Sequence, residues 1–207
     1  MANRKAIKME KKLLREWYSL EYDASVLKES RLRNDGKIII PAVLQKAEIK
    51  NQNKRRYGRG ILQREVMNYE KIVRENRALG ELDHPESSTV ALDRVSHIIR
   101  EIFWEGDVVR GKVEILNTPK GKILESLLES GVRVGMSSRG VGSTETTNEG
   151  VEDVQDDYQL ICFDAVSEPS TPGAFMNESV DVSEFRRSTS RADRIWRALN
   201  EIRNGRR

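Results

Sequence analysis

Two histidines in 207 residues limit where acid–base chemistry can occur in this chain. His84 stands in the segment GELDHP, where the following proline favours an extended backbone and ends strand pairing. An imidazole at the end of a strand can face a cleft and act as a general base. A surface or capping histidine in a turn is the alternative. His97 lies inside the apolar run VSHII, which indicates a half-buried strand histidine with a satisfied hydrogen bond.

Hydroxyl groups that such a base could activate occur in the segment GMSSRG. Alternation along a strand puts Ser137 and Ser138 on opposite sides, so Ser137 faces outward if the other side is core. Backbone N–H groups from Ser138 to Gly140, with Arg139 nearby, are candidates for holding an oxyanion or contacting a substrate. The segment does not match the GxSxG motif of α/β-hydrolases, and a polar strand end leading into a turn is the alternative.

One acidic residue lies in a strongly apolar segment. Asp164 falls within YQLICFDAV, and a carboxylate in such surroundings is costly unless it is paired or hydrogen-bonded. A histidine partner would satisfy the carboxylate and orient the imidazole, as in a catalytic triad. The alternative is an aspartate at an exposed strand edge. We interpret Cys162 as a core residue, because none of its sequence neighbours would lower the pKa of its thiol.

Strands and helices must bring these residues together, and hydrophobic periodicity predicts where they lie. Thr118 and the following proline predict a helix start, with the hydroxyl as N-cap, and Gly131 predicts its end. Residues 143–157 hold six acidic residues and no basic one, which predicts an exposed, mobile loop. The other predicted elements are strands at 37–44, 132–139 and 158–166, a helix at 61–76 and a hairpin at 94–116.

The composition excludes several classes of protein. A single cysteine excludes an intrachain disulfide framework and a zinc site built from several cysteines, which favours a reducing compartment. Two histidines leave little for multi-histidine metal chemistry. The longest apolar runs fall far short of the ~20 residues that cross a bilayer, and the N-terminus lacks the apolar region of a secretory signal. We therefore expect a cytoplasmic protein without a membrane contact.

Basic residues gather at both ends of the chain, although the net charge is only +3. Residues 1–16 hold six basic and two acidic residues, and residues 186–207 hold eight arginines and two acidic residues. The apolar stripe of the C-terminal segment includes Trp196, which favours docking in a protein groove over stacking on bases. We therefore do not expect nucleic acid as a partner. The predicted organisation is a basic helical arm at 1–17, a main domain at 18–182 and a basic amphipathic helical tail at 183–207.

Five segments, in this order, resemble the prohead core protein proteases of tailed bacteriophages, in particular those of T-even-like phages. They are AEIKNQNKRRYG, GELDHP, VSHIIREIFWEGDVVRGKVEIL, GMSSRGVG and FDAVSEPSTPGA, and they span most of residues 20–180. The family is similar to the herpesvirus assemblins. The resemblance therefore implies an α+β fold, a mainly antiparallel β-barrel surrounded by helices.

The resemblance also implies a serine endopeptidase that needs no metal or cofactor. Residue by residue, Ser137 matches the nucleophile and His84 the general base, and Asp164 stands where a third catalytic residue is expected. Two points stay open. Ser138 is the alternative nucleophile because the two serines are adjacent, and His97 is the alternative third member.

Substrates and location follow from the same resemblance. They would be the phage scaffold or core proteins, the capsid protein and the protease itself, cleaved inside the prohead in the host cytoplasm, with self-association expected. Cleavage after a glutamate two residues beyond Leu or Ile is expected of T-even-like relatives, and Leu199-Asn200-Glu201 predicts removal of the tail after Glu201. The rival hypothesis is a non-catalytic capsid or tail protein with the same barrel. A large separation between His84 and Ser137 would favour it.

Overall fold

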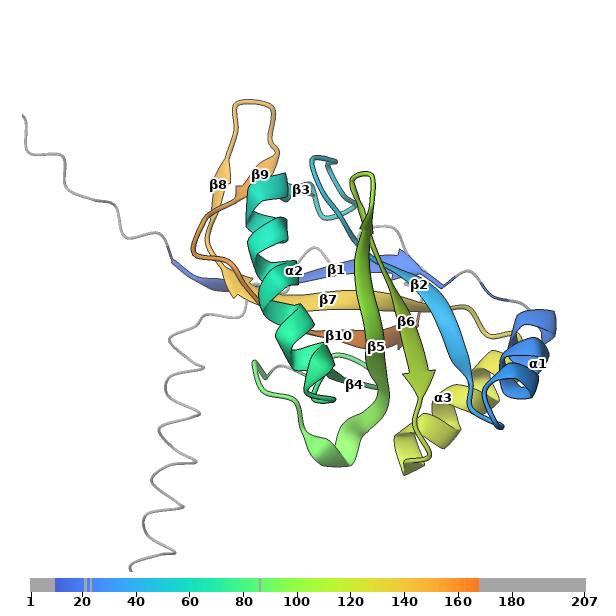
Figure 1. Cartoon of the computed structure of the whole chain (residues 1–207). Helices are drawn as coiled ribbons and strands as arrows, with labels where there is room; N and C mark the ends of the chain where they lie inside the picture. The colour runs from blue at the N-terminus through green and yellow to red at the C-terminus, as the bar shows by residue number, and fades with distance from the viewer. Residues whose placement is uncertain (1–9, 21, 23, 86, 168–207) are drawn as a thin grey trace, which may run out of the picture.

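The structure, a computed structural model, describes residues 10–20, 22, 24–85 and 87–167 (Figure 1). The predicted tail at 183–207, with Trp196 and Glu201, lies outside the described residues. The elements in chain order are β1 (Lys12–Ser19), α1 (Ala24–Arg33), β2 (Ile39–Lys46), β3 (Arg55–Arg56), α2 (Arg59–Arg74), β4 (Leu79–Glu81), the short 3₁₀ helix η1 (Leu92–Arg94), β5 (Val95–Glu105), β6 (Val108–Ile115), α3 (Pro119–Glu129), β7 (Val134–Gly142), β8 (Thr144–Thr146), β9 (Glu152–Val154) and β10 (Gln159–Ser167).

The strands form three open sheets within the described part of the chain. One sheet has the order β1-β7-β10, the second β2-β6-β5-β4, and the third β3-β9-β8. Every ladder is antiparallel except the short pairing of β3 with β9. The predicted α+β class with mainly antiparallel strands is confirmed. The closed barrel is not found, because β1 at the edge of the first sheet and β2 at the edge of the second form no ladder with each other.

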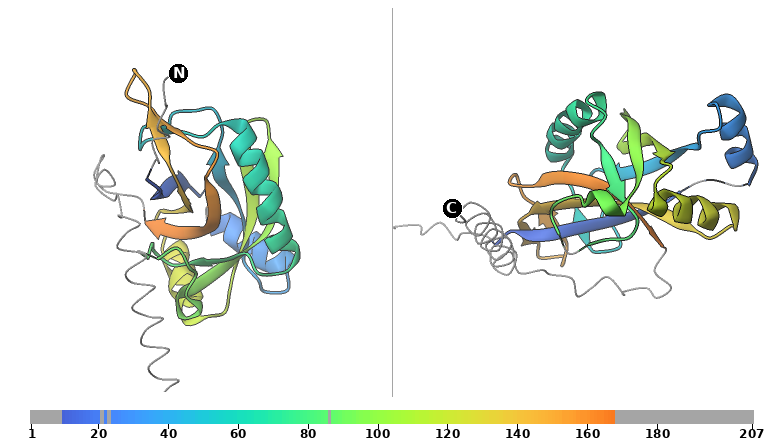
Figure 2. Two further views of the ribbon diagram at one scale, coloured as in Figure 1. Left: turned by 90° about the vertical axis from the view of Figure 1, so that its left-hand side faces the viewer. Right: turned by 90° about the horizontal axis from the view of Figure 1, so that it is seen from below.

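The two larger sheets pack face to face with their strands crossing steeply, as Figures 1 and 2 show. The main core lies between them and includes Ile40 and Ile99 from one sheet and Met136 and Phe163 from the other. Helix α2 adds Tyr69, whose ring meets that of Phe163 edge-on with 5.2 Å between centroids. The crossing brings β4 and β5 into contact with β10, which carries Asp164 and pairs with β7, the strand that carries Ser137.

Several predicted elements are confirmed close to their predicted limits. The helix at 61–76 is α2, and the hairpin at 94–116 is β5–β6 with Gly106 at φ 58° in its turn. The helix predicted to start at Thr118 is α3, and the Thr118 hydroxyl oxygen accepts a 2.9 Å hydrogen bond from the Gly121 N–H. Local signals suffice here because each element has its own apolar stripe, cap or turn residue.

The N-terminal arm differs from its prediction. Residues 12–19 form strand β1, which pairs with β7 over its whole length, so this part of the predicted helical arm is wrong. Its many charged residues suggested a helix, but the side chains alternate: Leu14 and Glu16 are buried on one side of the sheet, and Arg15 and Trp17 project from the other. Pairing with a distant strand overrides the local preference.

The acidic segment at 143–157 is also ordered differently from its prediction. It forms the hairpin β8–β9 instead of a loop without regular structure. Strand β3 supplies the missing positive charge, since Arg55 Nε lies 3.3 Å from Glu152 and Arg56 makes two 2.8 Å hydrogen bonds to Asp153. These arginines lie almost a hundred residues earlier in the chain, so the local charge count did not reveal them.

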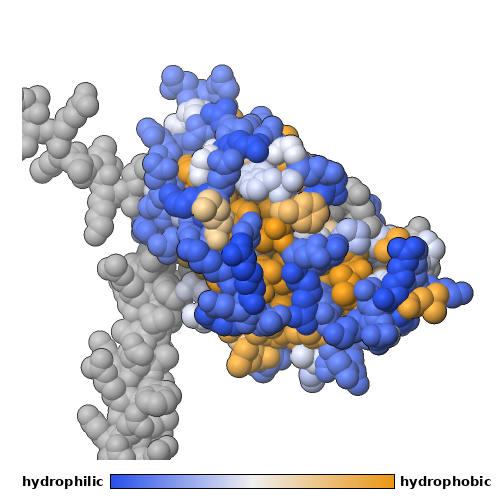
Figure 3. All heavy atoms as spheres, viewed as in Figure 1, coloured by the Kyte–Doolittle hydropathy of each residue, from blue (hydrophilic) through white to orange (hydrophobic). Residues whose placement is uncertain are grey.

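The surface is mostly hydrophilic on the face seen in Figure 3, with an apolar area near the middle of the view. Among the described residues, the exposed large apolar side chains include Met67 on α2 and Phe103 on β5. Among the described helices, none combines the length and the apolarity that crossing a bilayer would need.

Candidate active site

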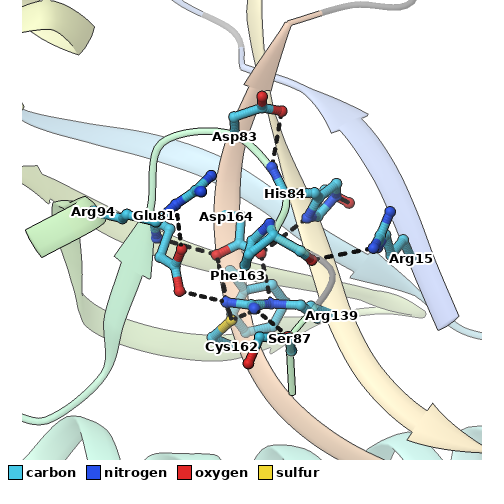
Figure 4. Close-up of polar contacts among 12 residues, drawn as sticks. Arg15, Glu81, Asp83, His84, Ser87, Arg94, Arg139, Cys162, Phe163 and Asp164 are labelled. Atoms are coloured by element: carbon cyan, nitrogen blue, oxygen red, sulfur yellow. Dashed lines mark hydrogen bonds and ion pairs between the residues drawn. The ribbon is translucent and has the colours of Figure 1, made fainter. Parts of the chain in front are cut away.

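The structure brings three of the predicted site residues into direct contact. Ser137 on β7 stands opposite Asp164 on β10 in the antiparallel register, so both side chains project from the same face of the sheet. His84 reaches this face from the segment after β4, as Figure 4 shows for His84 and Asp164. Its Nε2 lies 2.7 Å from the Ser137 hydroxyl oxygen and its Nδ1 lies 2.9 Å from Asp164 Oδ2.

A short turn after β4 directs the His84 imidazole over the sheet. Leu82 forms a parallel bridge with Ala165 of β10, and the Asp83 N–H donates a 2.8 Å hydrogen bond to the Ala165 carbonyl. Asp83 itself adopts φ 69°, and its carboxylate accepts a 2.8 Å hydrogen bond from the His84 N–H. Aspartate tolerates this left-handed conformation better than most residues. The turn thus fixes the histidine to the strand that carries Asp164.

Ser138 lies on the opposite face of the sheet from His84. Its fully buried hydroxyl accepts a 3.0 Å hydrogen bond from the Gln45 side-chain amide. Its cross-strand neighbours are Glu16 on β1 and Phe163 on β10. Of the two adjacent serines, the one in contact with the imidazole is Ser137.

His97 is part of the core next to the site. Its Nε2 lies 3.0 Å from the Phe163 carbonyl oxygen and its Nδ1 lies 2.8 Å from the Ser96 hydroxyl. Complete burial lowers the pKa of His97 to about 4, so the ring is neutral near pH 7. Of the two candidates for third residue, Asp164 is the one in contact with His84.

Asp164 is buried, and hydrogen-bond donors surround its carboxylate. Its Oδ1 accepts from the Glu81 N–H at 3.1 Å and from Arg139 Nη2 at 3.2 Å, while His84 faces Oδ2. Burial acts to raise the pKa of Asp164, but the hydrogen bond from His84 and the charge of Arg139 outweigh it and leave this pKa below its ordinary value. The carboxylate is therefore ionised, as an orienting partner for histidine must be.

Arg139 and Gly140, which were predicted to lie beside an oxyanion, both belong to the central strand β7. The Arg139 guanidinium is fully buried and contacts the carboxylates of Asp164 and Glu81. The backbone from Ser138 to Gly140 lies in the central strand of a sheet, paired with β1 and with β10, so its N–H groups face neighbouring strands. The oxyanion contacts of this segment stay a prediction.

Sequence reasoning missed Glu81 and the contacts that Arg139 makes with the two buried carboxylates. Strand alternation already put Arg139 on the same face as Ser137, and a carboxylate predicted to be buried needs a cation nearby. Glu81 belongs to the GELDHP segment but carried no signal of its own. Cys162 is buried, as predicted, and burial raises the pKa of its thiol.

Trp17 lies on the edge strand β1, next to Ser137 of β7. It stands opposite Ser137 in the register and packs over Gly135, where an added Cβ would lie 2.1 Å from the indole nitrogen. A pocket of about 320 Å³ opens beside it, lined also by Tyr18, Lys46 and Lys50. No group of three or more His, Cys, Asp or Glu side chains suited to a metal ion occurs in the described ranges.

Comparison with known proteins places this chain in a family. The chain matches the prohead core protein serine proteases over residues 20–186. It is 33% identical over 169 residues to the prohead core protein protease of Enterobacteria phage T4, a match that covers 79% of this chain and 80% of that protein. The solved structure of the bacteriophage T4 capsid assembly protease, gp21, matches with a TM-score of 0.67 and 29% identity, over 77% of this chain and 99% of that one.

The chain therefore belongs to the prohead core protein serine proteases, the capsid assembly proteases of phages. It is similar in both sequence and fold to the T4 enzyme. The predicted family and class of enzyme are thus confirmed.

Proposed function

We propose that Ser137, His84 and Asp164 form the catalytic triad of this serine protease. The observation that carries the proposal is the double contact of one imidazole, 2.7 Å from the Ser137 hydroxyl and 2.9 Å from the Asp164 carboxylate. A non-catalytic protein in which His84 and Ser137 are incidental would not need them in contact. The geometry supports the enzyme over that rival.

Each side chain has one task in the proposed reaction. Ser137 Oγ attacks the peptide carbonyl while His84 Nε2 takes its proton. The ionised Asp164 accepts the hydrogen bond from Nδ1, which keeps Nε2 free to act as base and stabilises the imidazolium. His84 then gives the proton to the leaving amine, which leaves the acyl group on Ser137 Oγ. Water attacks this acyl group while His84 takes a proton from the water, and His84 returns that proton to Ser137 Oγ as the acid product leaves. The residues invoked need no metal for this chemistry.

We propose that the substrates are proteins of the immature phage head. The T4 relative is named for the prohead core, and the solved neighbour is named for capsid assembly. Core or scaffold protein, capsid protein and the protease itself are the proposed targets, cleaved inside the prohead within the host cell. Self-association, the absence of nucleic-acid binding and the herpesvirus-like arrangement of the fold remain predictions, as does the division at residues 17 and 182.

Co-expression of the chain with its cognate core protein tests the triad. Ser137→Ala should abolish core cleavage, because no other hydroxyl contacts the His84 imidazole among the described residues. Ser138→Ala is the matched control. It loses one buried hydrogen bond to Gln45, worth about 1 kcal/mol of stability, and should retain cleavage. Undiminished cleavage by Ser137→Ala would refute the assignment.

Intact mass spectrometry of the same proteins tests removal of the tail. Active enzyme should lose the residues after Glu201, and Ser137→Ala protein should keep them. Identical full-length C-termini in both would overturn the self-processing proposal and leave the triad untouched.

A further inference from the structure

A cluster of buried charges lies around the carboxylate of Asp164, next to His84 (Figure 4). Arg139, Glu81 and Asp164 are each fully buried. Charged side chains are almost never fully buried unless they are paired, and taking each out of water costs several kcal/mol. Such a cluster beside reacting groups calls for an explanation beyond packing.

Arg139 contacts both oxygens of the Asp164 carboxylate. Its Nε lies 2.9 Å from Oδ2 and its Nη2 donates to Oδ1 at 3.2 Å. The same Nη2 lies 3.2 Å from Glu81 Oε1, and Glu81 donates its own N–H to Asp164 Oδ1 at 3.1 Å. Arg94 lies 3.0 Å from the other Glu81 oxygen. Two carboxylates and two guanidinium groups therefore alternate, and their charges cancel.

Arg139 also reaches the segment that follows the histidine. Its Nη1 donates to the Ser87 carbonyl at 2.6 Å. One planar guanidinium thus joins β7, which carries Ser137, to Asp164 and to the segment after His84. A lysine has a single ammonium group and cannot present this fixed fork of donors.

We propose that Arg139 is a positioning residue of the protease, which holds Asp164 ionised and oriented toward His84, with Glu81 balancing its charge. The inference rests on the proposed triad and assigns a task to a residue that touches no substrate. Without a cation beside it, the buried Asp164 would be protonated more readily, and a protonated Asp164 would be a weaker hydrogen-bond acceptor for the Nδ1–H of His84.

The groups that face Asp164 come from five elements and their connections. They are His84 after β4, Glu81 on β4, Arg139 on β7, Cys162 on β10, His97 on β5 and Tyr69 on α2, with Arg94 of η1 acting through Glu81. His97 is neutral near pH 7, and burial raises the pKa of both the Cys162 thiol and the Tyr69 phenol. Among these groups, Arg139 is the one permanently charged cation in direct contact with Asp164.

Three variants separate the charge of Arg139 from its geometry. Arg139→Gln removes the cation and leaves the cluster with one uncompensated negative charge. Arg139→Lys keeps the charge and loses the fork. The double variant Glu81→Gln with Arg139→Gln restores neutrality without restoring the fork, and it also serves if the single glutamine variant does not fold.

The measurement is the rate at which a fluorophosphonate probe labels the full-length enzyme between pH 5 and 9, which needs an active serine but no known substrate. All three variants should label about 10²-fold more slowly at the plateau of the pH profile, since a small misplacement of a reacting group lowers the rate by about this factor. In Arg139→Gln, the acid limb of the pH profile, where the labelling rate falls as the pH is lowered, should also move to higher pH. Removing a cation makes protonation of the His84–Asp164 pair more favourable. Arg139→Lys and the double variant should keep the wild-type limb.

Arg55→Gln is the matched control. Arg55 pairs at 3.0 Å with the buried Glu16 on the opposite face of the same sheet, so its loss should lower stability without moving the limb. A wild-type rate and limb in folded Arg139→Gln, or the same slowing in Arg55→Gln, would overturn the inference. Labelling that survives Ser137→Ala would instead overturn the proposed triad, so the two failures are distinguishable.

Discussion

Replacing the Asp164 carboxylate by an amide tests the proposed mechanism with almost no change in shape. The new NH₂ group must face one of the two carboxylate positions. The Oδ1 position already receives the Glu81 N–H at 3.1 Å, Arg139 Nη2 at 3.2 Å and the Cys162 thiol at 3.4 Å. A donor placed there would meet three donors. The Oδ2 position faces His84 Nδ1 and has one further donor beside it, Arg139 Nε at 2.9 Å. In Asp164→Asn, the NH₂ group meets fewer donors at Oδ2 than at Oδ1, so the amide oxygen takes the Oδ1 position and the NH₂ group faces His84 Nδ1.

This orientation reverses the tautomer of His84. Nδ1 must accept from the amide, so the ring proton moves to Nε2 and points at the Ser137 hydroxyl oxygen 2.7 Å away. An imidazole that donates at Nε2 cannot take the proton of the serine. Loss of the correct tautomer in a Ser-His-Asp triad costs about 10⁴-fold in kcat, or about 5.5 kcal/mol of transition-state stabilisation.

Two measurements check this expectation. Nitrogen-15 NMR of the imidazoles reports the tautomer directly, and the presence of only two histidines keeps the spectrum simple. Fluorophosphonate labelling reports the reactivity of Ser137. Asp153→Asn, on the exposed hairpin and paired with Arg56, is the control and should change neither reading. A folded Asp164→Asn enzyme with the wild-type tautomer and labelling within tenfold of wild type would refute the reasoning.

Two further outcomes concern packing around the site. Burial lowers the pKa of His97 from 6.5 to about 4, so between these values the unfolded chain binds a proton that the folded protein does not. The free energy of unfolding should therefore decrease by about 3 kcal/mol as the pH falls through this window. His97→Gln should lack that contribution in urea titrations at pH 7 and pH 4.5, and an unchanged pH dependence would contradict it. Gly80→Ala would place a methyl group 2.1 Å from the Phe163 carbonyl oxygen, so we expect about 2 kcal/mol of destabilisation and slower labelling; an unchanged thermal midpoint would contradict this.

Helices α2 and α3 and the β5–β6 hairpin were predictable because their signals lie within a few residues. Thr118 caps α3 through the Gly121 N–H, and Gly106 supplies the positive φ of the β5–β6 turn. The predictions failed where the partner is distant in sequence. Residues 12–19 form a strand only because β7 pairs with them, and the acidic hairpin is ordered by arginines of β3.

The sequence by itself pointed to the family, which the comparisons confirm, and predicted the candidate groups of the site. The scarcity of histidine and the cost of burying Asp164 already pointed to one base and one acid. The tertiary structure decided which serine contacts the base, because Ser137 and Ser138 differ only in which face of the sheet becomes the active one. It also decided the place of Arg139. A side chain that alternation puts beside Ser137 can face a substrate or a buried carboxylate, and only the packing of β4 and β10 around it shows that it contacts Asp164 and Glu81.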